Sequence, residues 1–322
     1  MMAAKISVVT PTLKRPDEVR DLLANLSCQT VLPFELLLVD GAPEGVNDTE
    51  QVVFQTTGLP FQVRYIRRSG GTAIQRNAGI DAGQGDFISF VDDDIRLEPD
   101  FFERMMEAFV GDQEGRIGGI TGYITNQHLD AATSRRWQWY RRMNLFTTYE
   151  PGRFDYETGY PINRYLQPPH DTLKPIDFMG AGCAVWRADV FKDGLRFSEF
   201  FTGFGVQEDA HLALRARRKW ELYEYGRAKC RHLYASSGRE DNRSIARKTA
   251  INNRYLFITI VPKRALIQEF RFWRVQFVQL VIFFAAAVRS PNRQNWSAVW
   301  GKLEGIFKSV FLKADLKRTA SS

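Results

Sequence analysis

Cysteine and histidine are scarce in this sequence of 322 residues, which contains three of the first and four of the second. The cysteines, Cys28, Cys183 and Cys230, stand far apart, so neither a disulfide framework nor the paired spacing of a zinc site is present. These absences exclude the small disulfide-rich secreted domains and the zinc modules. A chain with few, unpaired thiols fits a reducing compartment, so we expect a cytosolic protein.

Long uncharged apolar runs are also missing. The first ten residues contain no charged segment followed by an apolar one, so we expect no signal peptide. The most apolar stretch, residues 270–288, carries two arginines and two glutamines. It offers only about a dozen cleanly apolar residues, fewer than the ~20 that a spanning helix needs, so we expect an interfacial or re-entrant segment.

Charge is present in ordinary amount but is unevenly distributed. Residues 241–322 contain 15 Lys or Arg against 4 Asp or Glu, a net charge of +11, whereas residues 1–240 contain 29 against 33, a net charge of −4. A basic end of this kind indicates an anionic partner. Because no nucleic-acid-binding module is recognisable, we expect no nucleic acid partner and favour an anionic membrane surface.

The first third of the sequence alternates short apolar segments with helix-like segments. This pattern predicts an α/β fold with a mainly parallel sheet that is covered by helices on both faces. In such sheets, ligands bind beyond the carboxyl ends of the strands. The predicted strands are residues 5–10, 34–40, 61–66 and 86–91, and the predicted helices are residues 16–26, 47–54, 72–82 and 99–109.

The remaining sequence is less regular. We expect a strand at 117–125, a helix or ordered loop at 135–149, a long loop through 175, two short extended pieces in 176–187, a helix at 206–220, a short strand at 230–234 and a long helix at 244–260. This organisation predicts a domain over 1–262, divided into a nucleotide-binding half (1–115) and an acceptor-binding half (116–262).

A C-terminal helical extension, residues 263–322, is expected to follow that domain. Apolar residues in 296–311 recur at i, i+3, i+4 and i+7, while Lys302, Lys308 and Lys313 occupy other positions. This is the pattern of a basic amphipathic helix that lies on a membrane surface. We therefore expect residues 265–313 to contact anionic lipid; a helix packed on the domain core is the alternative.

Three consecutive carboxylates, Asp92, Asp93 and Asp94, follow the fourth predicted strand. Carboxylates this close repel one another unless a cation lies between them. Hard divalent ions with oxygen ligands, Mg²⁺ or Mn²⁺, suit such a group and also bind phosphates. A solvated acidic turn is the alternative.

Five motifs occur in a fixed order along the chain. These are Thr10-Pro11-Thr12 after the first strand, Asp40 after the second, the segment GTAIQRNAG over 71–79, the acidic triplet, and Glu208-Asp209 before a helix. Together they resemble the motifs of glycosyltransferase family 2, a group of nucleotide-sugar-dependent transferases with a GT-A (Rossmann-like) fold. The resemblance covers about residues 5–260. The chain departs from the family pattern at Gly41, where a second acid is common, and at Gln75, where alanine is common.

The resemblance implies a role for each motif residue. Asp92 and Asp94 would hold Mn²⁺ or Mg²⁺, joined by His232, for which a structural, hydrogen-bonded role is the alternative. The nucleotide-sugar would be bound by Thr10, Pro11, Thr12, Asp40, Arg76, Asn77, Asp92 and Asp93, and the acceptor side would be formed by Gly180, Ala181, Gly182 and Cys183.

The proton chemistry is expected at the fifth motif. An acceptor hydroxyl must lose a proton as it attacks the anomeric carbon, and a carboxylate can take that proton. By the resemblance this general base is Asp209, with Glu208 as the competing candidate. A single displacement would invert the anomeric configuration.

These inferences predict a metal-dependent inverting glycosyltransferase. It would move a sugar from a nucleoside diphosphate sugar, such as a UDP-sugar, to a saccharide or lipid-linked saccharide in surface polysaccharide biosynthesis. We expect it on the inner face of the cell membrane as a peripheral, cytoplasmic protein. The alternatives are a sugar-nucleotide nucleotidyltransferase, although its glycine-rich loop is missing from residues 10–15, and a non-catalytic nucleotide-sugar-binding protein at the membrane.

Overall fold

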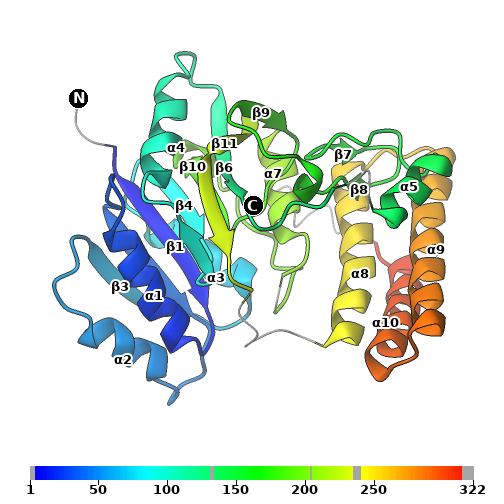
Figure 1. Cartoon of the computed structure of the whole chain (residues 1–322), viewed down its shortest axis with the longest axis horizontal. Coiled ribbons are helices and arrows are strands. Elements are labelled where there is room, and N and C mark those ends of the chain that lie inside the picture. Colours follow the sequence, from blue (N-terminus) through cyan, green and yellow to red (C-terminus); the bar gives the residue numbers. More distant parts are fainter. Residues whose placement is uncertain (1–3, 131–133, 204, 235–240, 314–322) are drawn as a thin grey trace.

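The computed structural model describes residues 4–130, 134–203, 205–234 and 241–313. The last nine residues of the predicted C-terminal extension therefore lie outside the described part. Figure 1 shows a twisted sheet with helices packed around it, and beside it three long helices, α8, α9 and α10. Helix α8 lies between the sheet and α9 (Figure 1).

The N-terminal half of the sheet is parallel, as predicted. Its strands run in the order β3-β2-β1-β4, and every neighbouring pair is parallel. Strands β1, β2 and β4 are buried along their whole length, because helices cover both faces. The bounds are β1 Ile6–Thr12, β2 Glu35–Asp40, β3 Gln62–Arg67 and β4 Phe87–Val91.

The sheet continues beyond β4 with mixed strand directions. Strand β10 is antiparallel to both β4 and β6, β11 is parallel to β6, and β5 and β9 are antiparallel to β11. The sheet is therefore parallel in its first half and mixed in its second. The bounds are β5 Ile95–Leu97, β6 Ile117–Ile124, β9 Leu173–Ile176, β10 Cys183–Arg187 and β11 Glu221–His232, of which the sequence predicted only the last part as a strand.

Helices cover both faces of the sheet, and each helix packs its apolar side against the sheet. Helix α1, for example, buries Val19, Leu22, Leu23 and Leu26, which are spaced i, i+3, i+4 and i+7. Helices α1, α2 and α4 share a core with one face, and α3, α6 and α7 share a core with the other. Their bounds are α1 Pro16–Ser27, α2 Asp48–Gln55, α3 Thr72–Ala82, α4 Phe101–Val110, α6 Asp189–Lys192 and α7 Glu208–Ala216.

The segment that the sequence predicts as a long loop contains short ordered elements. These are the paired strands β7 (Phe154–Asp155) and β8 (Tyr160–Pro161) and a 3-10 turn at Arg164–Leu166. Just before it, α5 (Arg135–Arg142) is the helical option of the prediction for 135–149, although it ends earlier. Aromatic residues of α5 pack with apolar residues of α9 in a small separate core, which attaches the segment to the C-terminal helices.

The C-terminal helices pack closely on one another. They are α8 (Asn242–Ile260), α9 (Leu266–Arg289) and α10 (Arg293–Val310). A Cβ atom added at Gly301 of α10 would lie 2.1 Å from the Arg243 carbonyl oxygen of α8, and one added at Gly305 would lie 2.5 Å from the Arg247 carbonyl oxygen. Only glycine fits at these contacts, so the two helices approach backbone to backbone.

Lys302 is buried, although the sequence places it off the apolar face of the predicted amphipathic helix. It is one of the largest fully buried side chains, and its Nζ donates to the Oε1 atoms of Gln276 (2.7 Å) and Gln279 (2.8 Å) on α9. Burial lowers the pKa of Lys302 to about 7. The two amide oxygens satisfy a group that would otherwise be costly to bury.

Candidate active site

A cavity of about 780 Å³ opens at the carboxyl ends of β1 and β4. This is the place where ligands bind in open α/β sheets, and the volume lies within the range of small-molecule sites. The cavity collects residues from four of the five sequence motifs. The predicted site residues in its walls are Pro11, Thr12, Arg76, Asp92, Asp93, Asp94, Ala181, Gly182, Glu208, Asp209 and His232.

Asp40 and Thr10 lie behind the cavity wall, although the resemblance assigns them to the nucleotide. Asp40 is 1% exposed, and its two oxygens accept from the hydroxyl of Tyr65 and the backbone N–H of Ala42, each at 2.8 Å. The hydroxyl of Thr10 donates to the Val91 carbonyl at 2.8 Å. Both side chains therefore make structural hydrogen bonds within the sheet and its adjoining loop and do not line the cavity.

Asn77 and Cys183 also face away from the cavity. The Asn77 amide donates to the Phe197 carbonyl (2.9 Å) and accepts from the Phe197 N–H (2.8 Å), so it fastens a loop to α3. Cys183 is fully buried beneath the acceptor-side segment. Gly180 is close to the site without lining it, since a Cβ atom there would lie 3.3 Å from Oδ2 of Asp209.

Arg76 lies between the acidic triplet at one end of the cavity, here called the metal end, and the Glu208-Asp209 pair at the other. Its Nη2 lies 2.9 Å from Oδ1 of Asp92, and its Nη1 lies 2.9 Å from Oε1 of Glu208. Burial disfavours the guanidinium charge, but Asp92 and Glu208 outweigh this effect and raise the pKa of Arg76. The resemblance assigns Arg76 to the nucleotide-sugar, whereas in the structure both of its terminal nitrogens are bonded to carboxylates.

The two acids of the fifth motif have different surroundings. Glu208 is held by Arg76 and by the hydroxyl of Thr72 at 3.1 Å. Asp209 accepts from the backbone N–H groups of Ala210 and Ala181, and it faces the cavity. Burial, followed by the nearby charge of Glu208, raises the pKa of Asp209 to about 6. A carboxylate with this pKa suits a general base near neutral pH better than one fixed in an ion pair.

Asp93 is the most deeply buried member of the acidic triplet. Its carboxylate accepts from Thr12 (2.7 Å) and from Arg15 (2.6 Å), so it ties the loop after β1 to the end of β4. Burial raises the pKa of Asp93 to about 6, and Arg15 opposes this rise. Asp92 is the more exposed acid, with one third of its side chain accessible, and it presents an oxygen to the cavity.

The two departures from the family pattern are linked in space. The Gln75 amide donates to the carbonyls of Thr12 (2.8 Å) and Val39 (2.7 Å), which end two neighbouring strands. A Cβ atom at Gly41 would lie 3.1 Å from Nε2 of Gln75. A larger side chain at position 41 would therefore meet the glutamine, which explains why glycine accompanies Gln75 in this chain.

Arg15 and Tyr165 line the cavity but were missed in the sequence. Arg15 directly follows the first motif, and a cation so close to a strand end was the signal that could have found it. Tyr165 comes from the 3-10 turn inside the predicted long loop, where no local pattern marks it. Its place depends on packing that periodicity does not encode.

The residues at the metal end fit a divalent cation. Oδ1 of Asp94 lies 3.2 Å from Nε2 of His232. Within the described residues, no group of three or more His, Cys, Asp or Glu side chains is arranged to hold an ion alone, so a cation would need further oxygen ligands, as Mg²⁺ commonly takes from water and substrate phosphates.

The surroundings of His232 support this fit. Nδ1 of His232 lies 2.5 Å from Nε2 of Gln127, while Oε1 of Gln127 is buried and has no hydrogen-bond partner among the described residues. If the amide turns by 180°, Oε1 accepts from Nδ1–H, and Nε2 of the ring is then free to bind a cation. Metal-binding histidines commonly donate their other ring N–H in this way.

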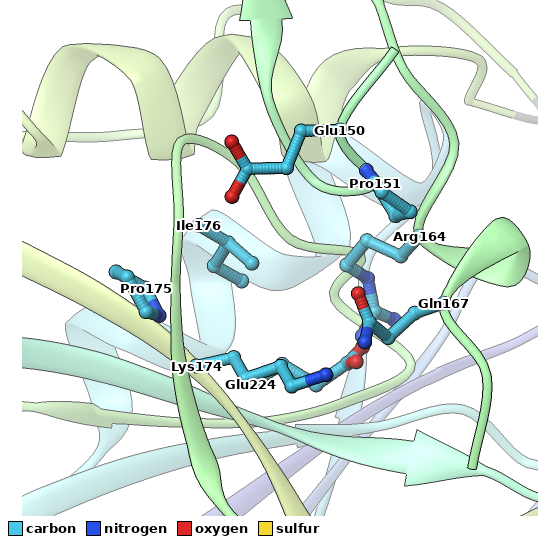
Figure 2. Close-up of a pocket in the computed structure, with 8 residues that line it drawn as sticks. All are labelled: Glu150, Pro151, Arg164, Gln167, Lys174, Pro175, Ile176 and Glu224. Carbon is cyan, nitrogen blue, oxygen red and sulfur yellow. The ribbon is translucent and has the colours of Figure 1, made fainter. Parts of the chain in front are cut away.

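A second, smaller cavity of about 80 Å³ is lined by residues of the segment 150–167 and of strands β9 and β11. Figure 2 shows its lining, in which Arg164 and Glu224 meet on one side. Both are buried, and His170 adds a contact to Glu224 at 3.0 Å. The ion pair links the 3-10 turn to β11 and so fixes the turn from which Tyr165 enters the large cavity.

The arrangement of the strands and the cavity at their ends is that of a GT-A fold. A mannosyltransferase from Pyrobaculum calidifontis, solved in complex with GDP-Man and Mn²⁺, has the same fold, with a TM-score of 0.57 and 11% identity over 97% of this chain and 88% of that one. Residues 7–193 match the model of glycosyl transferase family 2. The chain belongs to glycosyltransferase family 2.

Curated relatives cover part of the chain. It is 30% identical over 184 residues to YwdF of Bacillus subtilis (strain 168), an uncharacterized glycosyltransferase, covering 54% of this chain and 62% of that protein. It is 26% identical over 119 residues to TuaG of the same strain, named for teichuronic acid biosynthesis, covering 37% of this chain and 46% of that protein. The chain thus spans less than two thirds of these two relatives.

Proposed function

We propose that this protein is an inverting, metal-dependent glycosyltransferase. It takes a sugar from a nucleoside diphosphate sugar, such as a UDP-sugar, and transfers it to a saccharide hydroxyl in polysaccharide biosynthesis. The proposal depends above all on one observation: the acidic triplet, Arg76 and Asp209 line the same cavity. Family membership, the fold shared with a GDP-Man-bound mannosyltransferase and the name of TuaG support it.

The residues divide the reaction between two ends of the cavity. Asp209, held by the Ala181 and Ala210 N–H groups, accepts the proton of the acceptor hydroxyl as its oxygen attacks the anomeric carbon. Asp94 and His232 would hold the cation, and Asp92 lies beside them. When bound, the cation supplies positive charge that neutralises the departing nucleoside diphosphate. Because attack and departure occur on opposite faces of the sugar, one displacement inverts the anomeric carbon.

The product distinguishes this reaction from that of a nucleotidyltransferase. The purified chain, supplied with Mn²⁺, a panel of nucleotide-sugars and saccharide acceptors, is expected to release nucleoside diphosphate. Treatment with EDTA should abolish the release, and added Mn²⁺ or Mg²⁺ should restore it, because the leaving diphosphate otherwise carries uncompensated charge. Pyrophosphate as the product would instead identify a nucleotidyltransferase. Full activity in EDTA would contradict the metal role of Asp94 and His232.

We also propose that the C-terminal helices rest on an anionic membrane surface. Their apolar residues form an exposed set, here called the outer apolar surface, which consists of Phe270, Phe277, Val281, Phe284 and Val288 of α9 and of Trp296, Trp300, Leu303, Phe307 and Val310 of α10. The rings of Phe284 and Trp296 contact each other and so connect the two helices. Exposed apolar patches of this kind mark interaction surfaces.

Charge favours lipid as the partner of this surface. Arg289, Arg293, Lys308 and Lys313 are exposed around it, while the two acids of the same region, Glu269 and Glu304, are paired with arginines or lysine. Helix α9 is also long and apolar enough to cross a membrane by length and composition, with a mean hydropathy of 1.4 in its best window. We favour the interfacial position, because Arg271 and Arg274 of α9 are bonded to Glu157 and to the Asn144 carbonyl, which holds the start of the helix against the protein.

Vesicle flotation tests the membrane proposal. The double variant Phe277→Glu/Phe307→Glu should lose binding to vesicles with about one third anionic lipid, since each charge must enter the apolar interface. The matched control is Phe54→Glu, which alters an equally exposed phenylalanine on α2. Control and wild type should both float with the anionic vesicles and not with zwitterionic ones. Equal flotation of the double variant would exclude the outer apolar surface as the contact.

A further inference from the structure

The loop before the catalytic pair is attached to α8. Residues 202, 203 and 205–207, here called the catalytic loop, precede α7, at whose start Glu208 and Asp209 lie. The Asn252 amide donates to the Val206 carbonyl at 2.8 Å, and Nζ of Lys248 donates to the Thr202 carbonyl at 3.0 Å. The loop is therefore bonded to α8 near both of its ends.

The same face of α8 continues to contact the preceding segment. The ring of Tyr255 is stacked on Phe200 with centroids 3.7 Å apart, and its hydroxyl lies 3.2 Å from the Ser198 hydroxyl. Lys248, Asn252 and Tyr255 are spaced i, i+4 and i+7, so they form one stripe along the helix.

Another face of α8 is fixed by α10. Gly301 and Gly305 of α10 lie against the backbone of Arg243 and Arg247. Position 243 is about 140° around the helix axis from position 248, at 100° per residue. Helix α8 thus contacts the catalytic loop on one side and α10 on another. In Figure 1, α8 lies between the sheet and α9.

The catalytic loop needs such external support. Gln207 has φ of 74°, in the left-handed region, which is strained for a residue other than glycine. Its neighbour Val206 is the residue that Asn252 holds. On the opposite side, the Gly203 carbonyl accepts from the N–H of Thr72, the residue whose hydroxyl contacts Glu208. The loop is therefore held between α8 and the start of α3.

We infer that α8 positions the general base, with Asn252 and Lys248 as the positioning residues. Neither touches the reacting atoms. They act through the carbonyls of Thr202 and Val206, whose backbone leads into α7 and so determines where the Asp209 carboxylate lies. The inference rests on the proposed function, in which Asp209 takes the proton of the acceptor. It assigns to α8 a role in the chemistry rather than in covering the core alone.

Kinetics of two variants in the full chain test the inference. Asn252→Ala and Lys248→Met are each expected to lower kcat about tenfold while the donor KM changes less than about twofold, because misplacement of a base by a fraction of an ångström affects the reaction and not the binding of the donor. The matched control is Asn253→Ala, the neighbouring buried asparagine, for which no hydrogen bond to the described loop residues is found. Its kcat should stay within about twofold of wild type.

Hydrogen exchange measures the loop independently of activity. Amides of residues 205–210 should exchange faster in Asn252→Ala than in wild type or Asn253→Ala. Lys248 is partly exposed, so Lys248→Met keeps the kinetic test available if Asn252→Ala does not fold. Unchanged kcat and exchange in both variants would overturn the inference, and so would an equal loss in Asn253→Ala. If wild type transferred no sugar but Asn252→Ala still showed faster exchange in the loop, the positioning role of α8 would be upheld and only the proposed function contradicted.

Discussion

The Asp209→Asn variant should lose sugar transfer by a factor of about 10²–10⁴, the usual contribution of a general base. Asparagine keeps the shape of the side chain, and its Oδ1 can still accept from the Ala210 N–H, but it cannot take a proton. The donor should bind as before, because the nucleotide end of the cavity is unchanged. Initial rates of nucleoside diphosphate release at saturating donor and acceptor measure the effect.

Stability separates loss of chemistry from loss of fold in this variant. The folded-state pKa of Asp209, about 6, lies above its usual value of 3.8, so the folded protein disfavours the charged form. Stability from this group is therefore present below the unfolded pKa and is lost as the pH rises through 6. Replacing the charge at pH 8 should leave the melting temperature equal or higher. If Asp209→Asn kept a near-normal rate of sugar transfer, Asp209 would not be the general base and Glu208 would take that role.

The same pKa predicts the acid side of the pH profile. A base that is protonated below pH 6 cannot accept a proton, so kcat should fall tenfold for each unit below about pH 6 in the wild type. In Asp209→Asn the residual rate should lose this dependence. Profiles at fixed Mn²⁺ measure both, and a wild-type rate that stays constant down to pH 5 would contradict the assignment.

Local pattern was enough to predict the parallel half of the sheet. Strands β1, β2 and β4 are largely apolar runs, because helices cover both faces, and β1 and β4 end beside residues that line the cavity. Strand β11 was largely missed because charged residues alternate with its buried ones, which hides the strand among the neighbouring arginines and lysines. The segment 149–175 was predicted as a loop because its short strands depend on packing against α7, α8 and α9 rather than on their own sequence.

The sequence located the candidate site better than it oriented the side chains. Motif order brought Asp92, Asp94, Asp209 and His232 to one cavity. It did not show that Asp40 turns into the sheet toward Tyr65, since strand ends fix position but not rotation. Lys302 is a similar case: its burial follows from the nearby glycines and from amides on another helix, which no pattern within α10 reports.

Removal of Arg76 should affect both stability and transfer. In Arg76→Met, Glu208 and Asp92 lose a guanidinium at 2.9 Å, and Glu208 is left as a buried, unpaired charge. Breaking a buried pair from one side costs about 3 kcal/mol, so the melting temperature should fall clearly. Transfer should fall at least about 100-fold, because Glu208 and Asp92 border the two ends at which charge develops.

Two further variants decide whether the fork of Arg76 or its charge matters. Arg76→Lys keeps a cation but cannot reach two carboxylates in one plane, so it should recover most of the stability and little of the transfer. Arg104→Met is the matched control, because Arg104 also bonds two acids, Asp100 and Glu107, but at the surface, where ion pairs contribute little. Arg104→Met should melt and transfer like wild type. If Arg76→Met did the same, the bridge between Asp92 and Glu208 would have no part in holding the site, and the two ends of the cavity would be organised independently.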